Sequence, residues 1–337
     1  MKYVISVILL FFIGLAANYT YVNLGLYDND IKKCNAELIY RFDSINSKNE
    51  ILYLGESSNF TASDADSSKK SIAELINALN RVYTVADISK GAIHGSTYKV
   101  LIKRITEKST IKTVIVTLNL RSFGVNWIES DLETNLSRAN ILYSNHYPII
   151  KKALLSFKAY DNQELFKRKA SIKSHYRSDK FKLQTQKYEC VYEWDKELYH
   201  NGILDKDGKK NQEKTDIACH FIKNYAFVID EDNPRVKDFD DIVSYCKEHN
   251  ISLIFHVLPE NFERAAELCG NDLAVLMKTN TDYLKNRYQK EVVFIDNSSA
   301  LKDSFFIDRQ WPTEHYIFKG RYLIAKSISD QLIPISQ

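Results

Sequence analysis

The sequence predicts an α/β fold with a doubly wound, five-stranded parallel sheet, and two observations favour this class. Short apolar runs rich in β-branched residues recur along the chain, and helical patterns separate most of them. Near-continuous apolar runs are typical of strands that are covered on both faces. Parallel neighbours need crossover connections, which the helical patterns between them supply. The predicted strands are 51–55, 83–88, 113–120, 251–258 and 292–296.

The helical patterns lie between and beyond these runs. The first places Ile72, Leu75, Ile76 and Leu79 on one face, which is the spacing of an amphipathic helix. His256 lies inside the fourth apolar run, where a hydrogen-bonded core histidine is the favoured interpretation. The predicted helices cover 69–82, 98–108, 236–249, 262–288 and 319–332.

Two segments depart from this alternation. Residues 130–225 are rich in lysine and tyrosine and poor in apolar runs, so we interpret them as an insertion that forms a helical or irregular cap outside the sheet. Residues 23–48 are interpreted as a polar connector, and 49–337 as one domain that carries the insertion. The basic residues within 151–182 either meet an anionic lipid or glycan or form a solvated surface of the cap.

The N-terminal residues 1–22 predict a membrane anchor or a signal sequence. Tyr3–Ala17 carries no charge, and the apolar stretch continues to Val22, which is about the 20 residues that span a bilayer. Lys2 before this stretch suits an orientation with the N-terminus inside. A cleaved signal peptide is the alternative, because Ala16 and Ala17 are small. Either interpretation places the body of the protein outside the cytoplasm, in the periplasm or at the cell surface.

Composition bounds the partners and the redox chemistry. Hydrophobic residues make up 45% of the chain, and the net charge of +3 gives no sign of a nucleic-acid partner. The five cysteines fit no zinc pattern. In an oxidising compartment Cys190 and Cys219 are the first candidates for a disulfide. Cys246 and Cys269 fall on helical patterns and are interpreted as buried thiols.

Two polar residues far apart in the sequence form the candidate site. Ser57 follows the first predicted strand by two residues, and Gly55 permits a tight exit from that strand. His315 precedes the last predicted helix. A serine hydroxyl becomes a nucleophile when a neighbouring base takes its proton. The alternative is that Ser57 or Ser58 only caps a helix. The G-x-S-x-G elbow of α/β-hydrolases is not met, because Asn59 occupies its last position.

Four short segments together resemble the SGNH (GDSL-type) hydrolase superfamily. Ser57 follows the first strand, Gly95 follows the second, Asn119 ends the third, and His315 precedes the last helix. The resemblance implies an SGNH/flavodoxin-like sheet, with the serine as nucleophile and the histidine as base. It also implies an oxyanion hole made by the amides of Ser57 and Gly95 and by the side chain of Asn119, and such donors stabilise the developing charge.

The last segment departs from the family pattern D-x-x-H, because Pro312 holds the aspartate position. Asp308 and Glu314 are the candidate acids, and a serine–histidine dyad is a third alternative. Asp308 is favoured slightly, because Glu314 adjoins His315 and neighbouring side chains commonly diverge. Arg121 either binds a phosphate or carboxylate of a substrate or forms a surface salt bridge.

The resemblance is greatest to the membrane-anchored branch that includes the D-alanine-transfer protein of teichoic acid biosynthesis and the alginate acetylation proteins. The shared features are the N-terminal anchor, the serine segment, the insertion and the run IFHVLPEN at 254–261. They imply a serine acyltransferase or acyl esterase that acts on an envelope polysaccharide or related polymer, with no metal and no organic cofactor. A transferase would work beside a multi-pass membrane acyltransferase. The alternative, which the missing D-x-x-H aspartate favours, is a non-catalytic protein that binds or assembles the polymer.

Overall fold

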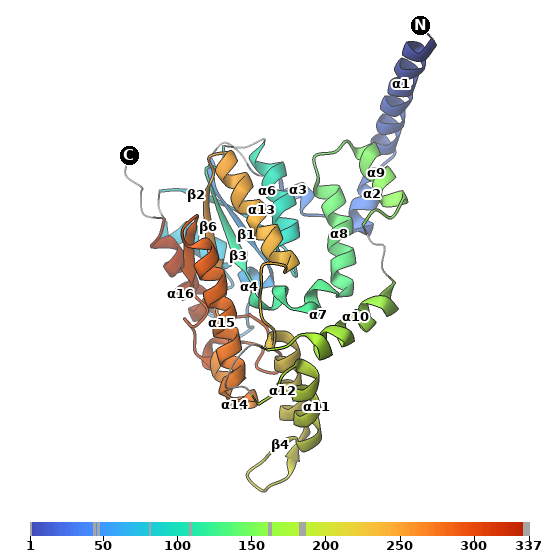
Figure 1. The fold of residues 1–337 in the computed structure, drawn as a ribbon. Helices are drawn as coiled ribbons and strands as arrows, with labels where there is room; N and C mark the ends of the chain where they lie inside the picture. Colours follow the sequence, from blue (N-terminus) through green and yellow to red (C-terminus); the bar gives the residue numbers. More distant parts are fainter. Residues whose placement is uncertain are drawn as a thin grey trace.

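The central sheet (Figure 1) has five parallel strands, as the sequence predicts. Their order is β2-β1-β3-β6-β7. The strands are β1 (Asn49–Gly55), β2 (Thr84–Ser89), β3 (Thr113–Leu118), β6 (Ser252–Val257) and β7 (Val293–Asp296). The computed structural model describes residues 2–42, 45, 48–80, 82–107, 110–160, 164–181 and 187–332.

Different helices cover the two faces of the sheet. In β1, Leu52 and Leu54 pack with α6, α13 and α15, whereas Ile51 and Tyr53 pack with α5 and α16. Successive strand residues point to opposite faces, so both sets are buried and the apolar run is continuous. The helices are α5 (Ile72–Leu79), α6 (Gly95–Thr106), α13 (Pro234–Glu248), α15 (Asn271–Tyr288) and α16 (Phe318–Ser329).

One predicted helix is two helices in the structure. The pattern at 262–288 forms α14 (Phe262–Cys269) and α15, which are separated by Gly270. Gly270 has a φ of +87°, which a residue without a Cβ adopts at low cost. The apolar periodicity continues across the break, and for this reason the sequence pattern alone suggests one helix.

The insertion lies outside the central sheet, as predicted, but part of it belongs to the main core. Leu136 and Leu142 of α8 and Phe221 of α12 are buried in the same cluster as β1 and β3. A two-stranded hairpin, β4 (Ile203–Leu204) with β5 (Lys210–Asn211), extends from it. Its helices are α8 (Asp131–Tyr143), α9 (Pro148–Ser156), α10 (Leu165–Ser178), α11 (Val191–Asn201) and α12 (Gln212–Tyr225).

The N-terminal segment forms α1 (Lys2–Asn23), which projects from the body (Figure 1). The part Tyr3–Asn23 is long and apolar enough to cross a membrane, and it is not buried in the protein; a signal sequence has the same properties. The segment 23–48 was predicted as a polar connector. This segment contains α2 (Leu26–Lys33) and α3 (Ile39–Phe42), and its apolar residues pack into the core.

The cysteines and the core histidine complete the comparison with the sequence. All five cysteines are free thiols, so the suggested pairing of Cys190 with Cys219 is wrong in this structure. Cys246 is buried, and Cys269 is half-buried. His256 is a core residue as predicted, with Nε2 3.0 Å from Thr117 Oγ1, and burial lowers its pKa to about 3.

Candidate active site

Ser57 lies at the carboxyl edge of the sheet, where the strand order reverses between β1 and β3. Ligands of open α/β sheets bind at such a switch point. Ser57 begins the short helix α4 (Ser57–Phe60) directly after β1. Gly55 is required for this exit, because a Cβ there would lie 2.6 Å from Tyr53 Cε1 and 2.8 Å from Ser89 Oγ. The strand therefore turns at the one residue type that fits.

Asn59 locks the turn that carries Ser57. Its Nδ2 donates to Ser89 Oγ at 2.8 Å and to the carboxylate of Asp87 at 3.0 Å, and its Oδ1 accepts from the Ala73 amide at 2.9 Å. The side chain thereby joins α4 to the end of β2 and the start of α5. From the sequence, Asn59 was considered only as the residue in the last glycine position of G-x-S-x-G. Its structural role was not predicted, because its hydrogen-bond partners lie 14 or more residues away.

A buried arginine joins the serine side of the site to the histidine side. Arg321 in α16 is fully buried, pairs with Asp66 at 3.0 Å, and donates to the Tyr316 carbonyl at 2.6 Å. It also donates to the carbonyls of Thr61, Ser68 and Lys70. No local sequence pattern marks this residue, because all its acceptors except the Tyr316 carbonyl lie about 250 residues earlier.

His315 and Asp308 are brought together by a hairpin. Phe306 and Tyr316 form an antiparallel bridge, and the Ile307 amide donates to the His315 carbonyl at 2.9 Å. Asp308 Oδ2 lies 2.5 Å from His315 Nδ1. Asp308 therefore occupies the orienting position that the D-x-x-H pattern would give to residue 312, and it reaches this position from seven residues upstream.

The serine completes a row of three side chains, Ser57, His315 and Asp308, which we call the catalytic row. Ser57 Oγ lies 3.0 Å from His315 Nε2, within the distance that general-base catalysis requires. The side chains of His315 and Asp308 are 19% and 36% exposed, and Ser57 is half-buried. A substrate can therefore reach the row. In this arrangement the histidine can accept the serine proton while the carboxylate fixes its tautomer.

Glu314 does not orient His315, which corrects its placement among the candidate acids. Its carboxylate accepts hydrogen bonds from Arg121 Nε and Nη2, from Asn119 Nδ2 at 2.9 Å and from Tyr225 OH at 2.9 Å. Arg121 likewise departs from the prediction, because its guanidinium pairs with this buried carboxylate and lies over the ring of Trp127. Neither predicted alternative for Arg121 foresaw a buried partner.

Glu314 belongs to a group of buried polar residues that we call the carboxyl cluster: Glu56, Glu260, Glu314, Arg121 and Tyr225. The Tyr225 hydroxyl lies 2.7 Å from Glu260 Oε2, and the Leu120 amide donates to Glu260 Oε1 at 3.3 Å. Glu56 is buried, and its Oε1 has no hydrogen-bond partner among the described residues. The cluster thus sets three carboxyl groups against one permanent cation.

The pKa values of the three carboxyl groups in the cluster are shifted in opposite directions. Burial alone would raise the pKa of Glu314, but the Arg121 charge and the hydrogen bonds from Arg121, Tyr225 and Asn119 together outweigh it, and the pKa lies below its usual value. Burial, and then the Glu314 charge, raise the pKa of Glu56 and Glu260. The Tyr225 hydroxyl has one proton and lies near both Glu260 and Glu314. We infer that protonated Glu260 donates to Tyr225 and that Tyr225 donates to Glu314.

Of the predicted oxyanion residues, Gly95 lies away from Ser57, and Asn119 contacts the carboxyl cluster. Gly95 begins α6 and faces α13, where an added Cβ would meet Asp238 at 3.0 Å. Gly91, in the same loop after β2, is the glycine whose added Cβ would face Ser57, at 4.0 Å from Ser57 Cβ. Asn119 directs its Nδ2 to Glu314 and has one further hydrogen on that nitrogen, so its oxyanion role stays a prediction.

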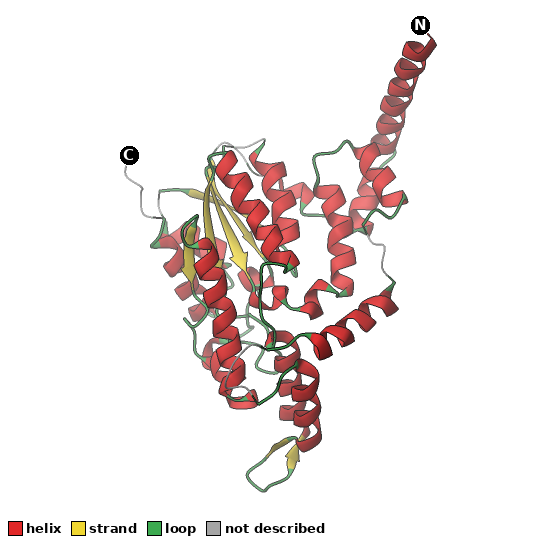
Figure 2. Ribbon diagram, viewed as in Figure 1, coloured by secondary structure: helices red, strands yellow, loops and turns green. Residues whose placement is uncertain are grey.

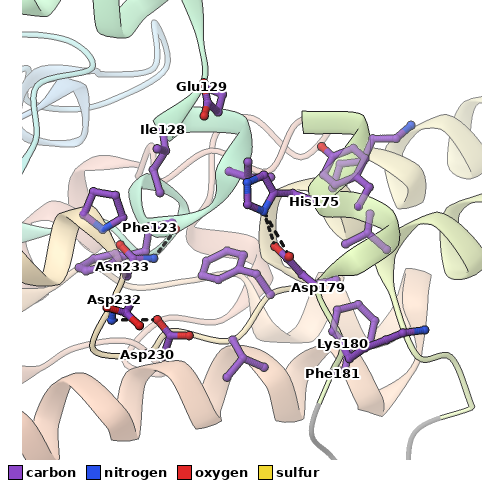
Figure 3. Close-up of a pocket in the computed structure, with 18 residues that line it drawn as sticks. Phe123, Ile128, Glu129, His175, Asp179, Lys180, Phe181, Asp230, Asp232 and Asn233 are labelled. Carbon is purple, nitrogen blue, oxygen red and sulfur yellow. Dashed lines mark hydrogen bonds and ion pairs between the residues drawn. The ribbon is translucent and has the colours of Figure 1, made fainter. Parts of the chain in front are cut away.

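A separate cavity of about 440 Å³ lies between α7 (Val125–Ile128), α10 and the loop before α13 (Figure 3). Phe123, Phe181 and Phe227 contribute aromatic rings to its wall, and His175 pairs with Asp179 at its edge. Ser57 and His315 are not among the described residues that line it. The cavity is therefore distinct from the catalytic row.

Comparisons with solved structures return distant neighbours. A lipase/acylhydrolase from Enterococcus faecalis is similar with a TM-score of 0.34 and 11% identity, over 84% of this chain and 95% of that chain. A catalytic mutant of an acetylxylan esterase from Geobacillus stearothermophilus has a TM-score of 0.39 and 10% identity, over 86% and 96%. No protein-family model and no curated protein matches the chain. We infer the roles of residues below from this chain's own geometry.

Proposed function

We propose that the chain is a serine-dependent acyl-transfer enzyme. The observation that carries the proposal is the catalytic row, in which a half-buried serine, a histidine and an aspartate are hydrogen-bonded in order. Asp308 supplies the carboxylate that Pro312, at the aspartate position of D-x-x-H, cannot provide. The sequence argument for a non-catalytic polymer-binding protein rested on that absence, and it is weakened accordingly.

In the proposed reaction, Ser57 Oγ forms a bond to the acyl carbon of an ester while its proton passes to His315 Nε2. The ester C–O bond then breaks, and His315 returns the proton to the leaving hydroxyl. Water or an acceptor hydroxyl attacks the acyl-serine, its proton passes to His315, and Ser57 Oγ leaves and recovers that proton. Asp308 orients the imidazole and stabilises its charged form throughout.

We assign the oxyanion donors to the Ser57 amide, the Gly91 amide and the second N–H of Asn119. Gly91 replaces the predicted Gly95 because it is the glycine that approaches Ser57. Each preorganised donor aimed at the developing charge contributes about 10²–10³-fold to the rate. The carboxyl cluster holds Asn119 from behind, so it is a positioning element rather than part of the reacting groups.

The proposed substrate is an acyl ester on an envelope polysaccharide or related polymer outside the cytoplasm. Two features support this choice: α1 can serve as a membrane anchor, and the strand arrowheads lie at the end of the sheet away from the free N-terminus (Figure 2). The site edge then faces away from the bilayer, toward the space in which the polymer lies. Hydrolysis and transfer differ only in the acceptor, and a transferase would work with a multi-pass membrane acyltransferase.

Mass spectrometry of the intact protein tests this proposal. The wild-type protein is mixed with an O-acetylated envelope glycan and quenched in acid, and a fraction is expected to carry one acetyl group on Ser57. Ser57→Ala is expected to carry none. Adding deacetylated glycan distinguishes the two reactions, because only a transferase moves the label to that acceptor. An acetyl group found on Ser57→Ala at the wild-type level would contradict the proposal.

A further inference from the structure

The helix α9 has its charged and apolar faces reversed with respect to an ordinary surface helix. Lys151 is only 2% exposed, and its Nζ donates to the Leu142 carbonyl at 2.7 Å, at the end of α8. Lys152 is 42% exposed and pairs with Asp30 of α2 at 2.8 Å. Lys151 therefore faces the protein and Lys152 bonds back to it, although charged side chains normally face solvent.

The outward face of α9 is apolar. Tyr147 is 72% exposed, Ile150 is 44% exposed and Phe157 is 86% exposed, and the exposed Ala153 lies between them. These positions are three or four residues apart, so they form one stripe along the helix. A contiguous exposed apolar surface of this kind marks an interaction site rather than a solvated one.

The position of α9 beside α1 identifies what covers this stripe. The Ile149 amide donates to Asn18 Oδ1 of α1 at 3.0 Å, and α9 lies at the base of the projecting helix (Figure 1). At 1.5 Å per residue, Asn18 lies about 22 Å along the helix from Tyr3. A hydrocarbon core is about 30 Å thick. When α1 spans the bilayer with Tyr3 at the inner boundary, the start of α9 therefore lies about 8 Å inside the outer boundary, within the depth that an interfacial helix reaches.

We propose that α9 is an interfacial helix that docks the catalytic domain on the outer surface of the bilayer spanned by α1. Its occupant is lipid, which Tyr147, Ile150 and Phe157 contact in the region between the acyl chains and the headgroups, where tyrosines of membrane proteins gather. The exposed Lys158 beside them meets lipid phosphates. This second contact fixes the orientation of the domain, which a single-helix tether would leave free to rotate.

Depth-dependent fluorescence quenching in proteoliposomes tests the proposal on the full-length chain. Ile150→Cys and Phe157→Cys are labelled with bimane, and the wild type carried through the same reaction gives the background from native thiols. The vesicles contain phosphatidylcholine and phosphatidylglycerol, with a doxyl group near the headgroup or deep in the acyl chain. Tyr199→Cys in α11 is a matched exposed control, and Leu10→Cys in α1 reports whether the anchor is inserted.

We expect the labels at 150 and 157 to lose fluorescence with the shallow quencher, the label at 199 to be unaffected, and the label at 10 to respond to the deep quencher. Labels at 150 and 157 that match 199 while 10 is quenched would overturn interfacial docking but not the anchor. An unquenched label at 10 would overturn both. Fluorescence lost equally in vesicles without doxyl lipid would indicate a second copy of the chain instead. Acylation of Ser57 is measured separately, so the proposed function stands or fails on its own.

Discussion

Two regions at the same edge of the sheet are built from neighbouring residues and have opposite properties. Glu56 and Glu314 of the carboxyl cluster adjoin Ser57 and His315 of the catalytic row. The row is partly exposed and hydrogen-bonded through an imidazole, whereas the cluster is buried around one ion pair. Adjacent residues can thus supply a partly exposed row and a buried polar support behind it.

The backbone explains why neighbours separate. Glu56 is in an extended conformation, and His315 lies in the extended arm that leads to the Phe306–Tyr316 bridge. Successive side chains of an extended chain point to opposite sides. Ser57 and His315 therefore face the more exposed side, and Glu56 and Glu314 face the interior. Each of the two segments, Glu56–Ser57 and Glu314–His315, thus contributes one residue to the catalytic row and one to the carboxyl cluster.

The largest expected effect on rate is that of Asp308→Asn. An amide at this position cannot stabilise the charged imidazole and favours the wrong tautomer, so kcat for an activated aryl acetate should fall about 10⁴-fold. The melting temperature should not change, because the side chain is partly exposed. Activity retained in Asp308→Asn but lost in Glu314→Gln at equal stability would reverse the roles of the two acids.

Glu314→Gln should affect stability rather than chemistry. The substitution leaves Arg121 as an uncompensated buried charge, and breaking such a pair costs about 3–5 kcal/mol of unfolding free energy. Denaturant unfolding measures this loss, and the double variant Arg121→Met with Glu314→Gln should recover part of it, because it removes both partners. An unchanged midpoint in Glu314→Gln would show that the cluster is not a structural support.

Asn119→Ala tests both regions at once, because the Asn119 side-chain nitrogen bonds Glu314 of the carboxyl cluster and is the proposed oxyanion donor beside the catalytic row. Loss of an oxyanion donor should lower kcat about 10²–10³-fold. Loss of the hydrogen bond to the charged Glu314 should lower stability by about 1.5–3 kcal/mol. Kinetics and thermal melts of the same purified variant give both values. A lower melting temperature with unchanged kcat would assign Asn119 to the cluster alone.

The smallest effect is expected from Glu260→Gln, and it concerns how the stability depends on pH. The pKa of Glu260 is raised well above its usual value, so the folded protein keeps a proton that the unfolded chain releases. Wild-type stability should therefore fall as the pH rises above the ordinary glutamate value, by about 1.4 kcal/mol per unit of raised pKa. Glutamine keeps the hydrogen bonds without the proton, so urea unfolding at about pH 5 and about pH 8 should show a smaller decline. An identical decline in the variant would contradict the protonated state of Glu260.

The sequence predicted the parts of this structure that depend on local patterns. The five strands follow from continuous apolar runs, and Ser57 and His315 follow from their positions at a strand end and before a helix. Gly95 was assigned from the family order alone, and only the packing of the loop after β2 points to Gly91 instead. The partner of Glu314 was not foreseen, because Arg121 lies 193 residues away. Long-range pairings of this kind leave no periodic signal in the chain.

The central claim is that His315 activates Ser57, and labelling with a fluorophosphonate probe tests it most directly. Ser58→Ala is the matched control, because Ser58 is fully buried and its hydroxyl has no hydrogen-bond partner in the described part of the chain. We predict that the wild type and Ser58→Ala incorporate one probe per chain, and that Ser57→Ala incorporates none. Equal labelling of Ser57→Ala, or no labelling of a folded wild-type protein, would contradict the account.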